Sequence, residues 1–255
     1  MSRRLRVLVA LATVAAMLLS LAGFASAQFE DVDEDAAYAD DVEFLYELGI
    51  TTGISATEFG PDQTLTRQQF AVFVTRAQKQ SALADSFANW RTNFTDDADI
   101  APWARGAVYL ASSSGIINGY PDGSFKPNNP VTVAEALTML VRALGFKTYA
   151  ESKGGFPAGY LVAAQELGLT DGLTLTAANL PMQRWEMAVA LANALDTPRT
   201  KKDDGSPDPN APGAADSKWI ALFDSPRAQY YEGVVEDVSG WNERITVGNR
   251  TFDFD

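Results

Sequence analysis

The chain has 255 residues, of which 46% are hydrophobic and 21% are charged, a composition typical of a protein that folds around an apolar core. It contains no histidine and no cysteine, which excludes Ser-His-Asp triads, histidine-based zinc sites, disulfides and a lipidated cysteine. Its formal charge is −13. Such an acidic chain should not bind nucleic acid non-specifically, because attraction to phosphate needs a basic surface.

The first 27 residues have the features of a secretory signal peptide. Three arginines precede an apolar run from Val7 to Phe24, and the small-x-small sequence Ala25-Ser26-Ala27 follows it. The alternative is a retained membrane anchor, since the run is nearly long enough to span a bilayer. The small residues favour cleavage, which leaves 33 acidic and 17 basic residues, a formal charge of −16. We therefore expect a secreted protein with no membrane span in the mature chain.

A five-residue pattern that begins and ends with glycine occurs three times, starting at Gly49, Gly115 and Gly168. In the first two copies a threonine, Thr66 or Thr132, follows at the same interval, and a helical apolar pattern comes after it. In the third copy the matching Gln183 comes two residues earlier. Recurrence with fixed internal spacing is typical of a repeat architecture.

Each repeat is predicted to contain two amphipathic helices joined by a turn-rich loop. Thr66 is a good N-cap for the second helix of repeat one, and Gln69 completes a capping box, as Glu135 does for Thr132 in repeat two. Helix pairs of this kind cannot bury their apolar stripes alone, so we predict a single shared core. Six residues should face its centre: Phe70, Phe73, Leu137, Leu140, Val189 and Ala190.

The predicted fold is therefore mainly α, with three tandem helix-loop-helix repeats. Repeat one is assigned to residues 28–80, a polar connecting segment to 81–93, repeat two to 94–147 and a divergent repeat three to 148–196. Residues 197–217 are rich in Pro, Gly, Asp and Lys and are predicted to be a linker. Residues 218–255 alternate like strands, too few for an independent domain, so we expect the start of a β-rich domain that is truncated here.

The repeats resemble the S-layer homology (SLH) motif. That motif opens with Phe-x-Asp-Val, has an aromatic-Ala pair and Gly-Ile-x-x-Gly, and ends after a Phe-x-Pro loop in Thr-Arg-Ala-Glu. Repeat one matches it at Phe29-Glu30-Asp31-Val32, Phe59-Gly60-Pro61 and Thr66-Arg67-Gln68-Gln69. Repeat two matches it at Phe94-Thr95-Asp96, Trp103-Ala104, Phe125-Lys126-Pro127 and Thr132-Val133-Ala134-Glu135. Three tandem copies behind a signal peptide make the resemblance specific.

The resemblance implies a pseudo-threefold helical bundle with three grooves between repeats. It also implies non-covalent anchoring of a secreted protein to secondary cell-wall polysaccharide, often pyruvylated, as part of an S-layer protein at the cell surface. Two alternatives remain open. The same module could anchor a surface enzyme, such as a polysaccharide hydrolase, whose catalytic domain lies beyond residue 255. The repeats could instead mediate lateral assembly with other S-layer subunits, without glycan affinity.

The family's groove residues are an arginine, an aspartate and aromatics. Carried over by motif position, the candidate glycan-binding residues are Arg67, Arg184, Asp31, Asp96, Trp103 and Tyr38, with Phe156 as the aromatic of repeat three. Val133 replaces the arginine in repeat two, so we expect affinity to rest mainly on Arg67 and Arg184.

Each candidate also has a simpler interpretation. The arginines could be solvated or paired with a neighbouring acid, and Trp103 could simply begin a helix. Gly53 and Gly119 could let the chain approach a ligand closely, but a backbone requirement is the simpler explanation. The run Asp31, Asp33, Asp35 lacks the Gly and Glu of a calcium loop. We therefore expect no metal, no cofactor and no catalysis in the repeats.

Overall fold

The computed structural model describes residues 29–173, 178–197, 202 and 205–207, and the backbone of 235–239, 244–247 and 250–253. The predicted signal peptide and most of the predicted linker lie outside these residues. The chain divides into two units, Met1–Trp219 and Ile220–Asp255, which are taken separately here. In the described part of the chain, no helix combines the length and the apolar character needed to cross a membrane.

The first unit is helical and follows the repeats. Repeat one contains α2 (Ala39–Glu47) and α3 (Arg67–Ala77), followed by α4 (Ser81–Ser86). Repeat two contains the 3-10 turn η1 (Asp97–Asp99), α5 (Pro102–Ser113) and α6 (Val133–Ala143). Repeat three contains α7 (Lys147–Ser152), α8 (Ala158–Glu166) and α9 (Arg184–Asp196). The prediction of a mainly α fold is confirmed, and α4 adds a helix within the segment predicted to be a polar connector.

The second helix of every repeat begins with a reciprocal capping box. In α3 and α6 the threonine hydroxyl accepts from the backbone N–H three residues on, and that residue's side chain accepts from the threonine N–H. These are the boxes predicted at Thr66 and Thr132. Gln183 and Glu186 form the corresponding box in α9, where the Gln183 N–H donates to Glu186 Oε2 over 2.7 Å. Each box satisfies helix-terminal donors that would otherwise lack partners.

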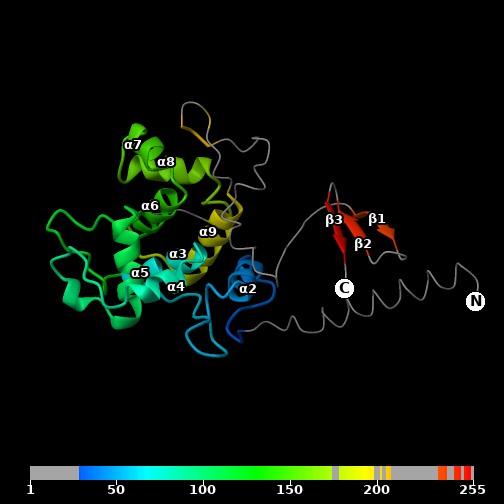
Figure 1. Ribbon diagram of the computed structural model, residues 1–255, viewed down its shortest axis with the longest axis horizontal. Coiled ribbons are helices and arrows are strands. Elements are labelled where there is room, and N and C mark those ends of the chain that lie inside the picture. Colours follow the sequence, from blue (N-terminus) through cyan, green and yellow to red (C-terminus); the bar gives the residue numbers. More distant parts are fainter. Residues whose placement is uncertain are drawn as a thin grey trace, which may run out of the picture. The chain divides into compact units, whose positions relative to one another are not determined.

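The second helices α3, α6 and α9 pack against one another pairwise and lie in the middle of the helical unit (Figure 1). The first helix of each repeat packs on the second helix of a neighbouring repeat, α5 on α3, α8 on α6 and α2 on α9. The six residues predicted to face the shared core are all buried. The contact between α2 of repeat one and α9 of repeat three closes the three repeats into a ring.

A cycle of backbone hydrogen bonds joins the three repeats just before their second helices. The N–H of Leu65 donates to Met182 O (3.2 Å), that of Val131 to Leu65 O (2.8 Å), and that of Met182 to Val131 O (2.8 Å). All three residues are buried, so these bonds satisfy backbone groups that water cannot reach. The cycle gives the bundle the pseudo-threefold arrangement that the resemblance implies.

Two glycines set the spacing of the peripheral helices. A Cβ added at Gly106 in α5 would lie 1.9 Å from the carbonyl oxygen of Ala84 in α4, and one at Gly159 in α8 would lie 2.1 Å from that of Ala150 in α7. Only glycine allows these close approaches, so α4 rests directly on α5 and α7 on α8. The helix that follows the second helix of repeats one and two is thus part of the repeating plan.

The second unit contains β1 (Val235–Ser239), β2 (Arg244–Val247) and β3 (Arg250–Asp253), which form an antiparallel sheet in the order β1-β2-β3. The pairing of β1 with β2 shifts register between Val235 and Asp237, whereas β2 and β3 pair in regular register from Arg244↔Asp253 to Val247↔Arg250. That these strands begin a larger domain stays a prediction.

Candidate functional site

Three equivalent junctions form where the N-terminus of a second helix meets the loop of the next repeat around the ring. The N–H groups of Arg67, Val133 and Arg184 donate to the carbonyl oxygens of Asn129, Leu180 and Gln63, respectively. The N–H of the following residue in each helix also donates to the neighbouring loop, at Pro127, Ala178 and Pro61. The backbone is therefore the same at all three junctions, and only the side chains distinguish them.

At the first junction, Arg67 is buried and fully engaged by repeat two. Its side chain is bonded through Nη1 to Glu135 Oε1 over 2.9 Å, and its Nε donates to Phe125 O over 2.7 Å. The guanidinium carbon lies 4.5 Å from the centre of the Tyr120 ring. The Tyr120 hydroxyl donates to the same Glu135 oxygen over 2.5 Å. The charge of Arg67 is thus neutralised inside the protein.

The titration of these groups reflects the closed network. Burial alone would raise the pKa of Glu135, but hydrogen bonds from Thr132 and Tyr120 and the charge of Arg67 hold that pKa below its ordinary value. Burial and the bond to Glu135 raise the pKa of Tyr120 to about 12. Glu135 therefore stays ionised and Tyr120 stays neutral at physiological pH, which keeps the ion pair to Arg67 intact.

At the third junction, Arg184 is equally buried but incompletely satisfied. Its Nε donates to Phe59 O over 2.6 Å, and its guanidinium carbon lies 4.7 Å from the Phe59 ring centre and 5.6 Å from that of Phe73. Only 4% of the residue is exposed, yet Nη2 has no hydrogen-bond partner among the described residues. Burial lowers the pKa of Arg184 to about 10, partly offset by the negative charge of Asp31.

The difference between the two arginines has a simple origin in the sequence. The position in repeat one that corresponds to Glu135 is Gln69, and the position that corresponds to Tyr120 is Ile54. A neutral amide cannot neutralise a guanidinium, and isoleucine offers neither a hydroxyl nor an aromatic face. The Gln69 oxygen is already used by the capping box, where it accepts from the Thr66 N–H over 2.8 Å. Among the described residues, no carboxylate therefore lies within ion-pair distance of Arg184, and the charge of Asp31 acts on it only from farther away.

An aromatic pair flanks the Arg184 junction. The ring of Tyr38, from the residue before α2, stacks on Trp185 in α9 with centroids 5.6 Å apart and planes 29° apart. The indole N–H of Trp185 donates to Gln183 Oε1 over 2.7 Å, which fixes the ring. Both side chains are half-buried, so part of each stays accessible to solvent. Such amphipathic rings are common where one face meets protein and the other meets water or a ligand.

At the second junction the cation is absent, because Val133 takes the position of the arginines. Val133 is 4% exposed and packs as an apolar residue. Its backbone N–H still donates to Leu180 O over 3.0 Å, so the junction keeps the shape of the other two. The side chain at this position therefore cannot neutralise an anion.

The two predicted aspartates hold the loops rather than project into open space. The Asp31 carboxylate accepts from the N–H groups of Phe59 and Gly60, each over 2.7 Å. Asp96 accepts from the corresponding N–H groups of the repeat-two loop, at Phe125 over 2.8 Å and at Lys126 over 2.7 Å. Each carboxylate thereby positions the loop whose carbonyl oxygen receives the Nε of Arg184 or Arg67.

The predicted glycines are backbone requirements. Gly53 has φ +76°, and a Cβ there would lie 2.5 Å from both Glu58 O and the Phe29 ring. Gly119 has φ +71°, and a Cβ there would lie 2.6 Å from the Phe94 ring. Both residues pack tightly against their own repeat, so the simpler of the two sequence interpretations is sufficient.

The remaining aromatics lie on the surface. Trp103 at the start of α5 is 60% exposed, and Phe156 is 58% exposed. Near Trp103, the N–H of Ala101 donates to Gln68 Oε1 over 2.9 Å, which places the N-terminus of α5 beside the Arg67 junction. In the described residues no group of three or more acidic side chains could hold a metal ion.

Comparison with known proteins shows which family two segments of the chain resemble. A model of the S-layer homology domain matches residues 28–71 and 93–137. A cell surface protein of Thermoanaerobacter kivui is 38% identical over 206 residues, which make up 80% of this chain and 26% of that protein. A middle cell wall protein of Brevibacillus brevis is 39% identical over 163 residues, 63% of this chain and 15% of that protein.

A third relative carries a different name. An amylopullulanase of Thermoanaerobacterium thermosulfurigenes is 32% identical over 115 residues, which make up 45% of this chain and 6% of that enzyme. The chain therefore spans about a quarter or less of the length of these three proteins. The two matched segments are similar to S-layer homology domains, and the relatives named as a cell surface protein and a middle cell wall protein support a secreted protein of the cell surface or cell wall.

Proposed function

We propose that this chain anchors a secreted protein non-covalently to the bacterial cell wall, as part of an S-layer protein, by binding secondary cell-wall polysaccharide. Within it, we assign the principal contact to the Arg184 junction, which would hold an anionic substituent of the polymer such as the carboxylate of a pyruvyl group. The observation that carries this assignment is the buried Nη2 of Arg184, which has no partner among the described residues.

A buried cation without a counter-ion is costly, so this arrangement needs a reason. An arriving carboxylate would take the place of the missing Glu135 equivalent and accept from Nη2, forming a charge-assisted hydrogen bond. Arg184 is also the first residue of α9, where the positive end of the helix dipole favours negative charge. Ligand binding would therefore complete a network that the protein leaves open.

The neighbouring aromatic pair suits the sugar that carries such a substituent. Tyr38 and Trp185 stack beside Arg184, and their half-buried rings offer apolar area together with polar edges. Because only 4% of Arg184 is exposed, we expect the side chains around it to adjust when the ligand enters. The indole of Trp185 should report this adjustment as a change in its fluorescence.

The other two junctions receive smaller roles under this proposal. Arg67 already has an internal carboxylate partner, so an incoming anion would have to displace Glu135. Val133 offers no charge at all. The expectation from sequence alone was that affinity rests mainly on Arg67 and Arg184 together, and we now propose that Arg184 dominates.

The same module would serve an enzyme equally well. Relatives named amylopullulanase and endoglucanase share this region over only a small part of their length. We assign no catalysis to the repeats, and a hydrolase domain elsewhere in the protein would leave the role of these residues unchanged. Lateral assembly without glycan affinity is the outcome that a binding experiment would have to exclude.

The test is co-sedimentation of the secreted chain with purified cell walls, before and after the secondary polysaccharide is extracted. We expect binding to the intact walls and loss of binding after extraction. Arg184→Met should weaken binding roughly ten- to a hundredfold, because a charge-assisted hydrogen bond contributes ~1.5–3 kcal/mol.

Val133→Ala is the matched control, since it alters the same helix position at the junction without a cation. It should bind walls as the parent does. Equal binding to extracted and intact walls would contradict the anchoring function, whereas parental binding by folded Arg184→Met would contradict only the site assignment.

A further inference from the structure

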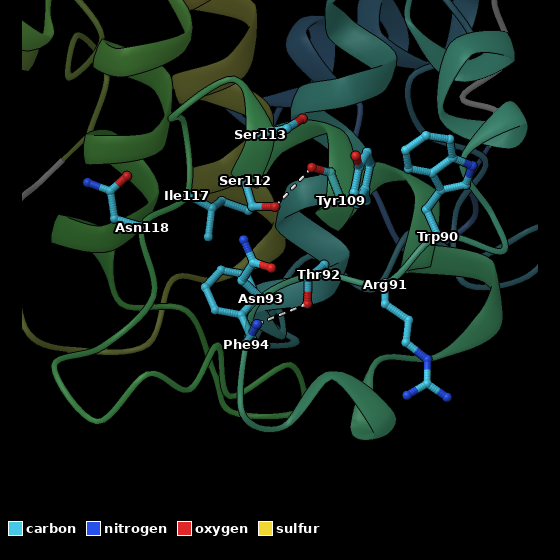
Figure 2. A pocket seen from close by; sticks show the side chains of 10 residues that line it. All are labelled: Trp90, Arg91, Thr92, Asn93, Phe94, Tyr109, Ser112, Ser113, Ile117 and Asn118. Atoms are coloured by element: carbon cyan, nitrogen blue, oxygen red, sulfur yellow. Dashed lines mark hydrogen bonds between the residues drawn. The ribbon is translucent and has the colours of Figure 1, made fainter.

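Repeat two and the segment before it form a pocket that contains neither buried arginine. It has a volume of about 510 Å³ and lies between the chain after α4 and the C-terminal half of α5 (Figure 2). The close approach of α4 to α5 at Gly106 places residues 87–93 over this face of α5. The pocket is therefore lined on one side by the non-helical segment 90–94, which follows α4, and on the other by residues of α5 and the chain just after it.

One end of the pocket is aromatic. Figure 2 draws Trp90 and Tyr109 at this end, and their ring centroids are 5.3 Å apart with planes 60° apart. Phe87 supports both rings from behind, at 5.2 Å from Trp90 and 5.1 Å from Tyr109. Trp90 is nevertheless 53% exposed. A large aromatic ring that is held in place by its neighbours and yet left open to solvent is typical of a binding surface rather than of a core.

The rest of the pocket is lined by the apolar residues Phe94 and Ile117, by Arg91 and by uncharged polar residues. Its lining includes Thr92, Asn93, Ser112, Ser113 and Asn118, with Asn118 at the end opposite the rings in Figure 2. In the described part of the chain, the side-chain amides of Asn93 and Asn118 form no hydrogen bond. The Tyr109 hydroxyl likewise forms none there. These groups are free to donate to or accept from a ligand.

Charge is limited to one of the residues that line the pocket. Arg91 is its one charged lining residue, and Figure 2 shows its guanidinium directed away from the other side chains. An amide provides a donor and an acceptor together, and the hydroxyl groups of a sugar need both. The exposed faces of Trp90 and Tyr109 provide apolar area for the C–H face of the same ring.

We propose that this pocket binds an uncharged pyranose ring, as a second glycan site that is separate from the arginine junctions. The ring lies against Trp90, and its hydroxyl groups bond to the amides of Asn93 and Asn118. This inference does not depend on the role of Arg184, because the two sites share no residue and call for different ligand chemistry, a neutral sugar here and an anion there.

The test is titration of the secreted chain with neutral trisaccharides of glucose, galactose, N-acetylglucosamine and N-acetylmannosamine, followed by tryptophan fluorescence and by calorimetry. We expect saturable binding of at least one of them. Trp90→Ala should weaken it at least tenfold and Asn118→Ala about threefold to tenfold, whereas Trp90→Phe, which keeps an aromatic face, should retain most of it.

Two matched variants keep the result specific. Trp103→Ala removes a comparably exposed indole from the same repeat, and Arg184→Met removes the proposed anion site. Both should bind the neutral trisaccharide as the parent does. The proposal is wrong if none of the four sugars saturates up to millimolar concentration, or if folded Trp90→Ala binds as tightly as the parent.

Discussion

The Arg67 and Arg184 junctions have the same backbone and the same arginine, but only one of them is electrostatically complete. Each guanidinium donates through Nε to the carbonyl oxygen of a loop phenylalanine, and each is 4% exposed. Arg67 then meets Glu135, whereas an Nη2 of Arg184 meets no acceptor in the described residues. The difference comes from two positions of the neighbouring repeat. Repeat two, beside Arg67, has Glu135 and Tyr120, whereas repeat one has Gln69 and Ile54 at the corresponding positions.

This comparison teaches that repetition of a motif does not repeat its function. The Arg67 junction has become a structural ion pair that holds repeats one and two together. The Arg184 junction keeps its cation available, at some cost in stability, and this is the pattern expected of a binding site. Four further experiments can break or sharpen this contrast.

The largest difference should appear when each arginine is replaced by methionine, which has a similar volume. Arg67→Met leaves the partly buried Glu135 without its cation and should cost about 3 kcal/mol of unfolding free energy. Arg184→Met removes a cation that has no ion-pair partner among the described residues, although its Nε bond to Phe59 O is lost, and should change stability by no more than about 1 kcal/mol. Urea unfolding of both variants measures the contrast, and equal losses would show that the arginines have the same structural role.

A smaller effect is expected at the aspartates that hold the loops. Asp31→Asn and Asp96→Asn each weaken one of two backbone hydrogen bonds and should each cost about 1–2 kcal/mol. Of the two aspartates, only Asp31 acts through its charge on the pKa of Arg184. Wall binding per folded molecule should therefore change in Asp31→Asn and stay at the parental level in Asp96→Asn. A change in both would mean that loop position, rather than charge, controls binding.

The smallest effect is expected in how stability depends on pH, which should differ between Glu135 in repeat two and Asp41 in repeat one. The pKa of Glu135 in the folded protein is held below its ordinary value. Its ionised form therefore stabilises the fold at pH values above the ordinary pKa, and this contribution is lost as the pH falls through the lowered pKa. Asp41 in α2, which packs on α9, behaves in the opposite way. Burial, with the charges of Asp40 and Asp196, raises its pKa to about 6.

Because the folded protein favours protonated Asp41, that contribution is complete below the ordinary pKa and is lost as the pH rises through about 6. Asp41→Asn should therefore raise the melting temperature by about 2 °C at pH 7 and leave it nearly unchanged at pH 4. Glu135→Gln should lower the melting temperature at pH 7, with the difference shrinking at low pH. Thermal unfolding from pH 4 to 8 measures both, and parallel curves for the two variants would contradict the assignment.

Much of the fold could be predicted from the sequence because its determinants are local. The glycine patterns, the capping boxes at Thr66 and Thr132, and the helical spacing of apolar residues depend on nearby positions, and the structure has helices where they indicate them. The shared core could also be predicted, because a single helix pair cannot bury its own apolar stripes. The helix α4 was missed because Ser81–Ser86 is short and polar, with Ala84 buried only through contact with a distant glycine.

The chemistry of the site could be predicted less well, because it depends on pairs of residues from different repeats. Arg67 and Glu135 are 68 positions apart, and nothing in either segment alone shows that they meet. The exchange of Glu135 for Gln69 is visible when the repeats are aligned, but its meaning needs the cyclic order that places repeat one beside repeat three. The role of the aspartates as loop clamps likewise emerged only from their bonds to residues about 30 positions away.

The central claim is that wall binding depends on an arginine left without an internal counter-ion. The most direct measurement is the wall affinity of Gln69→Glu, which keeps the capping box and Arg184 but supplies the carboxylate that Glu135 supplies to Arg67. We predict that its affinity falls roughly ten- to a hundredfold while its stability is maintained. The reciprocal Glu135→Gln should not lose affinity per folded molecule. Parental affinity in folded Gln69→Glu would contradict the claim.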